Sequence, residues 1–366
     1  MYQIDFKKPL TVHFIGIGGI SMSGLAEILL QENFKVRGSD TQKSLLTEHL
    51  KECGAEIFYG QRGENIGEDT DLVVYTAAVH EDNPEYQEVL KRGIPALTRA
   101  ELLGQMMKNY HHAVAIAGTH GKTTTTSMLT EILLTSKMDP TISVGGILPS
   151  IGGNIRVGGQ EYFVTEACEY TNSFLSFFPT IGVILNIEAD HLDFFKDIDD
   201  IRRSFRKFAE RLPKDGVLIL DGSIPNPEEI INGLSCKVVV VSHGPEGDYG
   251  VKDIVYDDLG CPSFTVMRNG VLWGEAHLSV PGEHNVYNGL AAIAAAEVLG
   301  VPGEKIFLGL KNFSGTKRRF EKKGVVGGVT IVDDYAHHPR EIAATLKAAR
   351  HYPHKKLWCV FQPHTY

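Results

Sequence analysis

The sequence contains no apolar run as long as the roughly eighteen residues of a membrane-spanning helix, so it predicts no membrane insertion. Its N-terminus, MYQIDFKKP, lacks the apolar core of a secretory signal peptide. The 5 cysteines are scattered and odd in number, and no two have Cys-x-x-Cys spacing. This excludes an evident disulfide framework or zinc motif. We therefore expect a cytoplasmic protein.

Positive charge is also scarce, since 45 acidic residues outnumber 36 lysines and arginines and give a net charge of −9. A nucleic-acid-binding protein needs basic patches for affinity, so we expect no nucleic acid partner. Small anionic ligands need only local positive charge and are not excluded. At 366 residues the chain exceeds one usual core, which favours two or three domains.

The clearest functional signal is a glycine-rich turn between a predicted buried strand at 114–117 and a predicted helix at 127–134. Backbone N–H groups in such a turn, together with the helix N-terminus, bind phosphate. Lys122 would reach the β- and γ-phosphates of ATP, and the Thr123 hydroxyl would contact Mg²⁺. Ile116 occupies the position of the first glycine in the standard pattern, and an ordinary structural turn is the alternative.

A second glycine-rich turn follows a predicted strand at 10–15 and precedes a helical segment at 25–30. With a further strand at 34–38 ending near Asp40, it is typical of the first unit of a Rossmann-like domain. Ser21 replaces the third glycine of the NAD fingerprint. We interpret the turn as a binding site for a nucleotide phosphate, with a merely structural turn as the alternative.

The same small α/β domain continues with predicted strands at 71–75 and 94–97. A helix beginning at Pro84 lies between them, and a helix at 99–107 follows. Thr76 and Ala77 close the first of these strands. We expect the domain to end near residue 108.

Two predicted strands of the next domain end in acidic or imidazole side chains. The strand at 161–165 leads into Glu166, and the strand at 180–185 leads towards His191. A parallel sheet places its ligands at the carboxyl ends of its strands, so both residues are candidates for holding Mg²⁺ or the reacting phosphate. Mg²⁺ prefers oxygen, which makes histidine an unusual ligand. Asp190 and Asp193 could instead simply cap the following helix, predicted at 202–212.

The chain then becomes rich in predicted strands, at 216–220, 237–241, 263–266 and 277–280, with Asn269-Gly270 as a hairpin turn. His284, Asn285 and Asn288 gather before an alanine-rich helix at 289–299. Asparagine side chains can recognise an adenine edge, and N-capping by Asn285 is the alternative.

Three cations at 317–319 mark a predicted domain junction, although a solvated charge run is the simpler interpretation. A strand at 329–332, a helix at 340–350 and a strand at 357–361 follow. Two strands are too few for an independent α/β domain, so we expect a third domain that is cut short.

Eight short motifs follow one another along the chain: GIGGISMSG (16–24), AGTHGKTTT (117–125), EACE (166–169), NIEADHLD (186–193), PGEHNVYN (281–288), KRRFE (317–321), DDYAHHP (333–339) and FQPHTY (361–366). In this order, over essentially the whole chain, they resemble the Mur ligase family. The resemblance implies an α/β fold with a UDP-sugar-binding Rossmann-like domain (1–108), a central P-loop ATPase domain with a β-rich part (109–312) and the start of a C-terminal Rossmann-like amino-acid-binding domain (313–366).

The resemblance implies that ATP and Mg²⁺ drive the joining of L-alanine to the lactyl carboxylate of UDP-N-acetylmuramate through an acyl phosphate, in cell-wall synthesis. A ligase that attaches a preformed peptide to the same sugar nucleotide is the alternative within the family. Outside it, the alternatives are a nicotinamide dehydrogenase and a nucleotide-binding module without catalysis. We expect a monomer or a homodimer.

The resemblance also implies roles for individual residues. The expected catalytic residues are Lys122, Glu166 and His191, and Thr123, Glu166 and His191 are expected at the metal. The expected ATP contacts are Gly118, Thr119, His120, Gly121, Lys122, Thr123, Thr124, His284, Asn285, Asn288, Arg319 and Asp334. The expected UDP-sugar contacts are Gly18, Gly19, Ile20, Ser21, Met22, Ser23, Asp40, Thr76 and Ala77. Tyr335 and His337 are expected on the amino-acid side.

Overall fold

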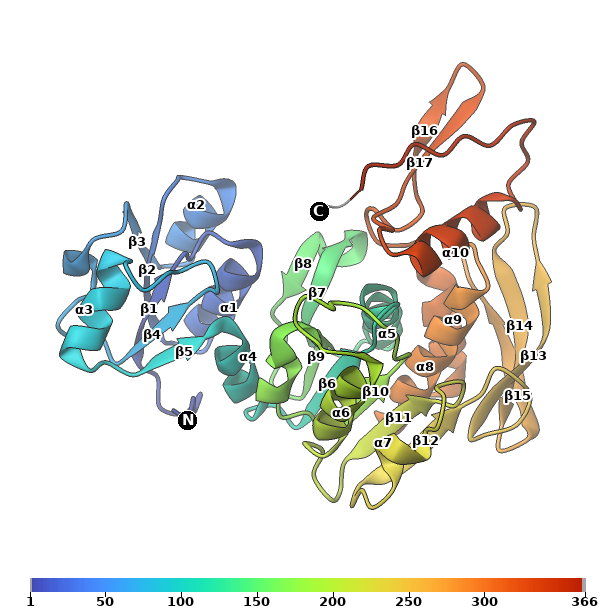
Figure 1. Ribbon diagram of the computed structural model, residues 1–366, viewed down its shortest axis with the longest axis horizontal. Helices are drawn as coiled ribbons and strands as arrows, with labels where there is room; N and C mark the ends of the chain where they lie inside the picture. Colours follow the sequence, from blue (N-terminus) through green and yellow to red (C-terminus); the bar gives the residue numbers. More distant parts are fainter. Residues whose placement is uncertain (1, 364–366) are drawn as a thin grey trace.

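Three β-sheets organise the computed structural model, which describes residues 2–363 (Figure 1). The first sheet has five parallel strands in the order β3-β2-β1-β4-β5. Its strands are β1 (Thr11–Ile15), β2 (Lys35–Asp40), β3 (Glu56–Tyr59), β4 (Leu72–Tyr75) and β5 (Ala96–Thr98). Its helices are α1 (Ile20–Gln31), α2 (Leu45–Glu52), α3 (Pro84–Arg92) and α4 (Arg99–Met107), with a short 3-10 turn, η1 (Gly63–Asn65).

Strand β1 is apolar along its length because helices cover both faces of this sheet. Val12 and Phe14 pack into one core, while Ile15 packs with Val73 and Val89 on the other face. The sequence predicted this parallel arrangement, and α4 has the predicted bounds. The predicted start of α3 is also confirmed, since Pro84 is its first residue and Asn83 caps it.

The central sheet has ten strands in the order β15-β14-β13-β12-β11-β10-β6-β9-β7-β8. They are β6 (His112–Ala117), β7 (Thr141–Leu148), β8 (Gly153–Arg156), β9 (Tyr162–Ala167), β10 (Ile181–Ile184), β11 (Val217–Asp221), β12 (Lys237–Val241), β13 (Tyr249–Tyr256), β14 (Pro262–Arg268) and β15 (Val271–His277). Strands β6, β7 and β9 to β13 run parallel to one another. At the two ends of the sheet the pairing is antiparallel: β8 pairs with β7, β14 with β13, and β15 with β14.

Strand β6 divides the packing of the central domain. Its alanines, Ala113, Ala115 and Ala117, face a core that includes α6 (Ile198–Ala209). Val114 and Ile116 face the opposite core, formed with α5 (Lys122–Thr135), α8 (His284–Val298) and α9 (Gly303–Asn312). Two short 3-10 turns, η2 (Pro149–Ile151) and η3 (Tyr170–Ser176), and the short helix α7 (Glu228–Ile231) complete this domain.

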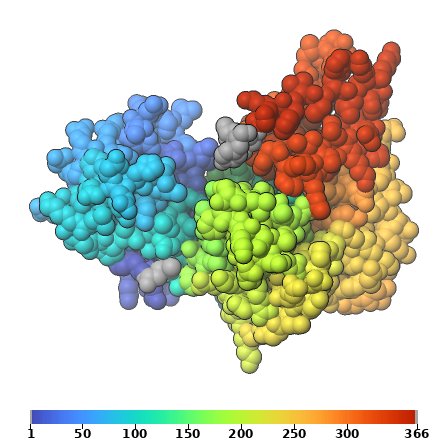
Figure 2. Space-filling view, in the orientation of Figure 1, coloured from blue at the N-terminus to red at the C-terminus, as the bar shows by residue number. Residues whose placement is uncertain are grey.

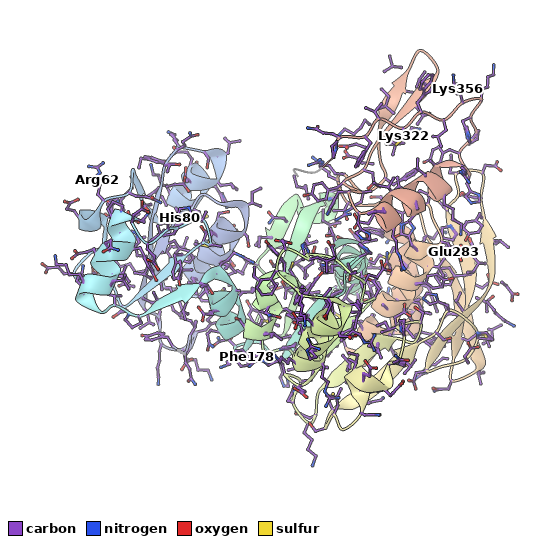
Figure 3. All side chains as sticks on the ribbon, viewed as in Figure 1. Arg62, His80, Phe178, Glu283, Lys322 and Lys356 are labelled. Carbon is purple, nitrogen blue, oxygen red and sulfur yellow. The ribbon has the colours of Figure 1, made fainter. Side chains whose placement is uncertain are left out.

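The N-terminal and central domains meet where α4 packs on η3. The Lys108 ammonium lies 3.8 Å from the centroid of the Phe178 ring, and Phe178 marks this junction in Figure 3. Gly104 lies so close to the carbonyl oxygen of Ser176 that an added Cβ would sit 1.9 Å from it. Glycine is therefore required for this approach of the two domains.

The C-terminal segment consists of an antiparallel hairpin, β16 (Glu321–Val326) and β17 (Val329–Asp333), followed by α10 (Pro339–Ala349). The hairpin projects from the molecule in Figure 1, and Lys322 lies on it in Figure 3. Figure 2 shows this segment beside the central domain, away from the N-terminal domain.

Two predicted strands are wrong. Residues 357–361 form no strand: they pair with no strand among the described residues, and Val360 is 99% exposed. The strand predicted at 277–280 lies earlier, since β15 ends at His277. The predicted turn before it is confirmed: Asn269 and Gly270 both have positive φ, at 50° and 76°, and join β14 to β15.

Several other bounds differ from prediction. Helix α1 begins at Ile20 rather than Leu25, α5 at Lys122 rather than Ser127, and α8 at His284 rather than Gly289, so each helix begins directly at its candidate site. The last three residues of the FQPHTY motif lie outside the described residues. Within residues 2–363, no helix combines the length and apolar character that crossing a membrane would require.

Helices α5 and α9 approach closely at Gly309, where an added Cβ would lie 2.5 Å from the Cα of Ile132. We expect Gly309→Ala to lower the free energy of unfolding by about 1–3 kcal/mol, because backbone must move to admit the methyl group. Gly289 in α8 is the control, since its added Cβ would make only ordinary contacts with Leu278 at 3.6 Å. Gly289→Ala should be neutral or stabilising by up to about 1 kcal/mol, as alanine favours helix. Urea denaturation of both variants measures the difference, and equal effects would contradict it.

Candidate functional site

The phosphate-loop turn, the carboxyl ends of β9 and β10, the start of α8 and the segment around α10 surround one cleft of about 1160 Å³. This is the edge of the parallel sheet where the sequence predicted a ligand site. The cleft collects Lys122, Glu166 and His191, which are far apart in the sequence. The three predicted catalytic residues therefore share one site.

Lys122 is the first residue of α5, directly after the glycine turn. Gly118 and Gly121 have φ of 143° and 85°, which L side chains rarely adopt, so both positions need glycine. The Lys122 ammonium donates to the carbonyl oxygens of Gly118 and Thr119, at 2.5 and 3.1 Å, and to Glu169 Oε2 at 3.0 Å. Burial acts to lower the pKa of Lys122, but the charge and hydrogen bond of Glu169, together with nearby Cys168 and Glu166, outweigh it and the pKa is raised. Lys122 therefore carries a positive charge inside the cleft.

Thr123 and Glu166 form the best candidate metal site. The Thr123 hydroxyl donates to Glu166 Oε2 at 3.1 Å, and the backbone N–H of Gly145 donates to Glu166 Oε1. Burial raises the pKa of Glu166, although these hydrogen bonds and the nearby Lys122 oppose the rise. A hydroxyl and a carboxylate beside a phosphate-binding turn are the oxygen ligands that Mg²⁺ prefers.

His191 lies in the loop after β10, with a φ of 52°. Its ring packs on Tyr170 with centroids 4.5 Å apart, and Asp190 Oδ1 accepts from its backbone N–H. The Tyr170 hydroxyl donates to Asp193 at 2.8 Å. The alternative that Asp190 and Asp193 cap α6 is wrong, because Asp197 caps that helix. These acids instead hold the loop that carries His191.

The adenine candidates lie at the start of α8. Asn285 donates to the carbonyl oxygen of Pro281 at 2.7 Å, and Asn288 donates to Asn285 Oδ1 at 3.1 Å. Asn285 lies inside the helix, which has Glu283 at its cap position, so the alternative of N-capping by Asn285 is wrong. Asn288 Oδ1 would lie 2.4 Å from a Cβ at Gly121, so the Asn288 amide packs directly against the glycine turn. His284 is exposed and lines the cleft.

The C-terminal segment contributes a charged network across the cleft. Glu341 Oε1 lies 3.1 Å from His120 Nδ1 and 3.9 Å from an Arg319 nitrogen, and Arg340 pairs with Glu188. Arg319 also lies 5.5 Å from the centroid of the Tyr335 ring, so it is not part of a merely solvated charge run. Sequence reasoning assigned no role to Glu188, Arg340 or Glu341.

The remaining predicted residues of this segment are also placed at the cleft. Asp334 accepts from the backbone N–H groups of Phe320 and Ala336 and from the Thr345 hydroxyl, which makes it an anchor of the segment. Tyr335 and His337 have ring centroids 5.2 Å apart and both line the cleft. Thr119, His120 and Gly121 of the phosphate turn and Thr124 of α5 line it as well.

The predicted UDP-sugar residues form a separate group in the N-terminal domain, following β1 and β4 and at the last residue of β2. The backbone N–H of Gly18 donates to Asp40 Oδ2 at 2.8 Å, so this acid braces the turn. Gly19, Ile20, Met22 and Ser23 continue from that turn into α1, and Thr76 and Ala77 follow β4. Arg99, which sequence reasoning missed, donates from Nη1 to the Ser21 hydroxyl at 3.1 Å. Burial lowers the pKa of Arg99.

Glu341 gives the cleft a pH dependence. Burial acts to raise its pKa, but the hydrogen bond and charge of His120 and the charge of Arg319 lower the pKa to about 2, below the ordinary 4.5. Its stabilising effect is therefore complete above pH 4.5 and is lost as the pH falls through 2. Near neutral pH we expect Glu341→Gln to lower the free energy of unfolding by on the order of 3 kcal/mol relative to the wild-type chain. This difference in stability should disappear as the solution becomes acidic. Urea denaturation of both chains across this range measures the gap, and a gap independent of pH would contradict the assignment.

Models of three Mur ligase domains match the chain in succession: "Mur ligase family, catalytic domain" at residues 11–111, "Mur ligase middle domain" at 116–296 and "Mur ligase, glutamate ligase domain" at 318–365. The UDP-N-acetylmuramate–L-alanine ligases of Lachnospira eligens and Agathobacter rectalis are 60% and 59% identical to it, covering 100% of the chain and 80% of each relative. The chain belongs to the Mur ligase family.

Solved Mur ligase structures agree with the fold of this family member. The UDP-N-acetylmuramate-alanine ligase of Thermotoga maritima has a TM-score of 0.78 at 30% identity, covering 93% of this chain and 78% of that one. A murein peptide ligase from Psychrobacter arcticus has a TM-score of 0.77 at 27% identity, covering 93% and 76%. The predicted α/β fold of a Mur ligase is thereby confirmed.

Proposed function

We propose that the chain catalyses the ATP-dependent joining of L-alanine to the lactyl carboxylate of UDP-N-acetylmuramate. One observation carries the proposal: Lys122, Thr123 and Glu166 are assembled at a phosphate-binding turn, in a chain 60% identical over its whole length to a ligase of that name. The proposed division of labour follows the three predicted domains, with the sugar nucleotide on residues 1–108, ATP on 109–312 and the amino acid on 313–366.

The reaction requires two transfers. A lactyl carboxylate oxygen attacks the γ-phosphorus of ATP, the bond to the bridging oxygen breaks, and ADP leaves an acyl phosphate. The alanine nitrogen then attacks the acyl carbon, phosphate departs, and the amine gives up a proton. Phosphoryl transfer depends on positioning and charge neutralisation, which the buried ammonium of Lys122 provides.

Thr123 and Glu166 fit a magnesium ion, because both supply oxygen and lie 3.1 Å apart beside the turn. His191, from the same cleft, is the third proposed ligand. Mg²⁺ bound there would neutralise phosphate charge. Tyr170 and Asp190 hold the His191 loop in place, which fixes the direction of the imidazole.

The other predicted contacts remain part of the proposal. His284, Asn285 and Asn288 would meet the adenine side of ATP, and Arg319 and Asp334 would approach it from the C-terminal segment. Gly18 to Ser23, Asp40, Thr76 and Ala77 would hold the UDP-sugar, with Arg99 added because its cation reaches Ser21. Tyr335 and His337 would face the amino acid. A cytoplasmic location and a monomeric or homodimeric state are expected with this role.

ADP release measured with one component omitted at a time tests the proposal. We expect release only when Mg·ATP, UDP-N-acetylmuramate and L-alanine are all present. Release with the tripeptide L-alanyl-γ-D-glutamyl-meso-diaminopimelate in place of L-alanine would favour the peptide-attaching alternative, for which structural relatives exist. Binding of both nucleotides without ADP release would identify a non-catalytic module. If NAD alone stabilised the protein against unfolding, the dehydrogenase alternative would be supported. Membership of the Mur ligase family argues against that alternative.

A further inference from the structure

Three side chains from distant segments meet at the rim of the cleft. His120 belongs to the phosphate turn, Glu188 follows β10, and His338 caps α10. They bring one ligand atom each to within 4.8 Å of one another. We propose that His120, Glu188 and His338 form a site for a transition-metal ion of the Zn²⁺ class, separate from the Thr123–Glu166 pair.

Two atoms of this group lack any hydrogen-bond partner among the described residues. His120 Nε2 and Glu188 Oε2 are buried and face each other across 3.4 Å. His120 Nδ1 lies 3.1 Å from Glu341, so a neutral His120 donates its single N–H to that carboxylate and keeps a lone pair on Nε2. Unless His120 takes up a second proton on Nε2, two buried acceptors face one another with nothing between them, which is unfavourable. A cation bound between them satisfies both.

The surroundings resemble the outer shell of a metal site. Glu341 orients His120, and Arg340 holds the other oxygen of Glu188. Histidines that bind metals usually donate their second ring nitrogen to a carboxylate in this way. The rings of His120 and His338 have centroids 4.6 Å apart. Two imidazoles and one carboxylate suit Zn²⁺ better than Mg²⁺ and leave one position open to the cleft.

A metal at this site would tie the phosphate turn to the start of α10. Because His120 lies in the turn that the proposed function gives to ATP, bound Zn²⁺ would oppose the entry of Mg·ATP. Metal binding itself does not depend on the proposed function; only this competition does.

Zn²⁺ titration of the full chain without nucleotide, followed by calorimetry, tests the site, and Co²⁺ substitution gives a visible spectrum that reports tetrahedral ligation. We expect His338→Asn to weaken binding at least tenfold. Asparagine is a good helix N-cap, so this change removes the imidazole and keeps α10 capped. Glu341→Gln should weaken binding by about 10–100-fold, because it removes the carboxylate behind His120.

A second group provides the matched control. His111, His112 and Glu161 also bring ligand atoms within 4.8 Å, but His111 and Glu161 are exposed. The double variant His111→Ala/His112→Ala should keep the affinity. Loss of binding in that variant, unchanged affinity in His338→Asn, or no binding at micromolar Zn²⁺ would each overturn the site. An ATP analogue that leaves Zn²⁺ affinity unchanged would overturn the competition.

Discussion

A Lys122→Ala variant should lose about 10³-fold of the ATP-dependent turnover and should also unfold more easily. The ammonium is the charge that the turn places where phosphate is expected, and one such group is worth about this factor. The same change leaves the carboxylate of Glu169, only 2% exposed, without its cation. Breaking a buried pair in this way typically costs about 3–5 kcal/mol. Steady-state ADP release and urea denaturation measure the two losses separately.

The double variant Lys122→Ala/Glu169→Gln separates the two effects. Neutralising Glu169 removes the unpaired charge, so much of the stability should return, whereas turnover should stay low. If Lys122→Ala kept its affinity for Mg·ATP and its turnover, the assignment of the phosphate site would be wrong.

A Glu85→Ala variant should lower the unfolding free energy by about 3–5 kcal/mol, a large part of the stability of a typical domain. Glu85 is fully buried at the start of α3, where it accepts from Ser39 at 2.6 Å and from Asn65 at 2.5 Å, and it lies 3.3 Å from His13. Burial acts to raise its pKa, but these three partners lower it. Removing the carboxylate would leave the Ser39 hydroxyl and His13 Nε2 without this buried partner, while Asn65 would keep only its bond to the carbonyl oxygen of Gly60.

Glu88→Ala is the matched control on the same helix. Glu88 pairs with Lys91, which is 77% exposed, and such surface pairs contribute at most about 1 kcal/mol. Denaturation of both variants in urea near neutral pH measures the difference. Similar losses would show that the Glu85 network does not hold the first domain together.

Elements whose local pattern and tertiary role agree were predictable from the sequence. Strands β1 and β6 are apolar runs followed by glycine turns, and both occupy central positions in their sheets. Strand β7 was not predicted, because Gly145 and Gly146 within it indicate a loop. Its pairing with β9 overrides that local preference. Strand β16 begins with Glu-Lys-Lys-Gly and, within residues 2–363, pairs with β17 alone.

The same reasoning explains which residues of the candidate site could be predicted from the sequence and which could not. Lys122, Thr123 and Glu166 were predictable because a strand end or a glycine turn immediately precedes each of them. Glu341 looks like an ordinary acid in the first turn of α10, and nothing near it in the sequence indicates a contact with His120, 221 residues away. Arg99 was equally hidden, since its contact with Ser21 spans 78 residues. Local patterns do not encode such long-range partners.

The order of strands in the two large sheets also determines when each sheet can be completed while the chain is being synthesised. All five strands of the first sheet come from residues 11–98, so an emerging chain can complete that sheet early. Strand β6 lies between β9 and β10 and cannot be enclosed before residue 184 has emerged. Until then the ribosome-bound chain exposes an apolar strand with at least one open edge, and such long-range parallel pairing is slow. The central domain, rather than the first, is therefore where we expect a growing chain to need protection from aggregation.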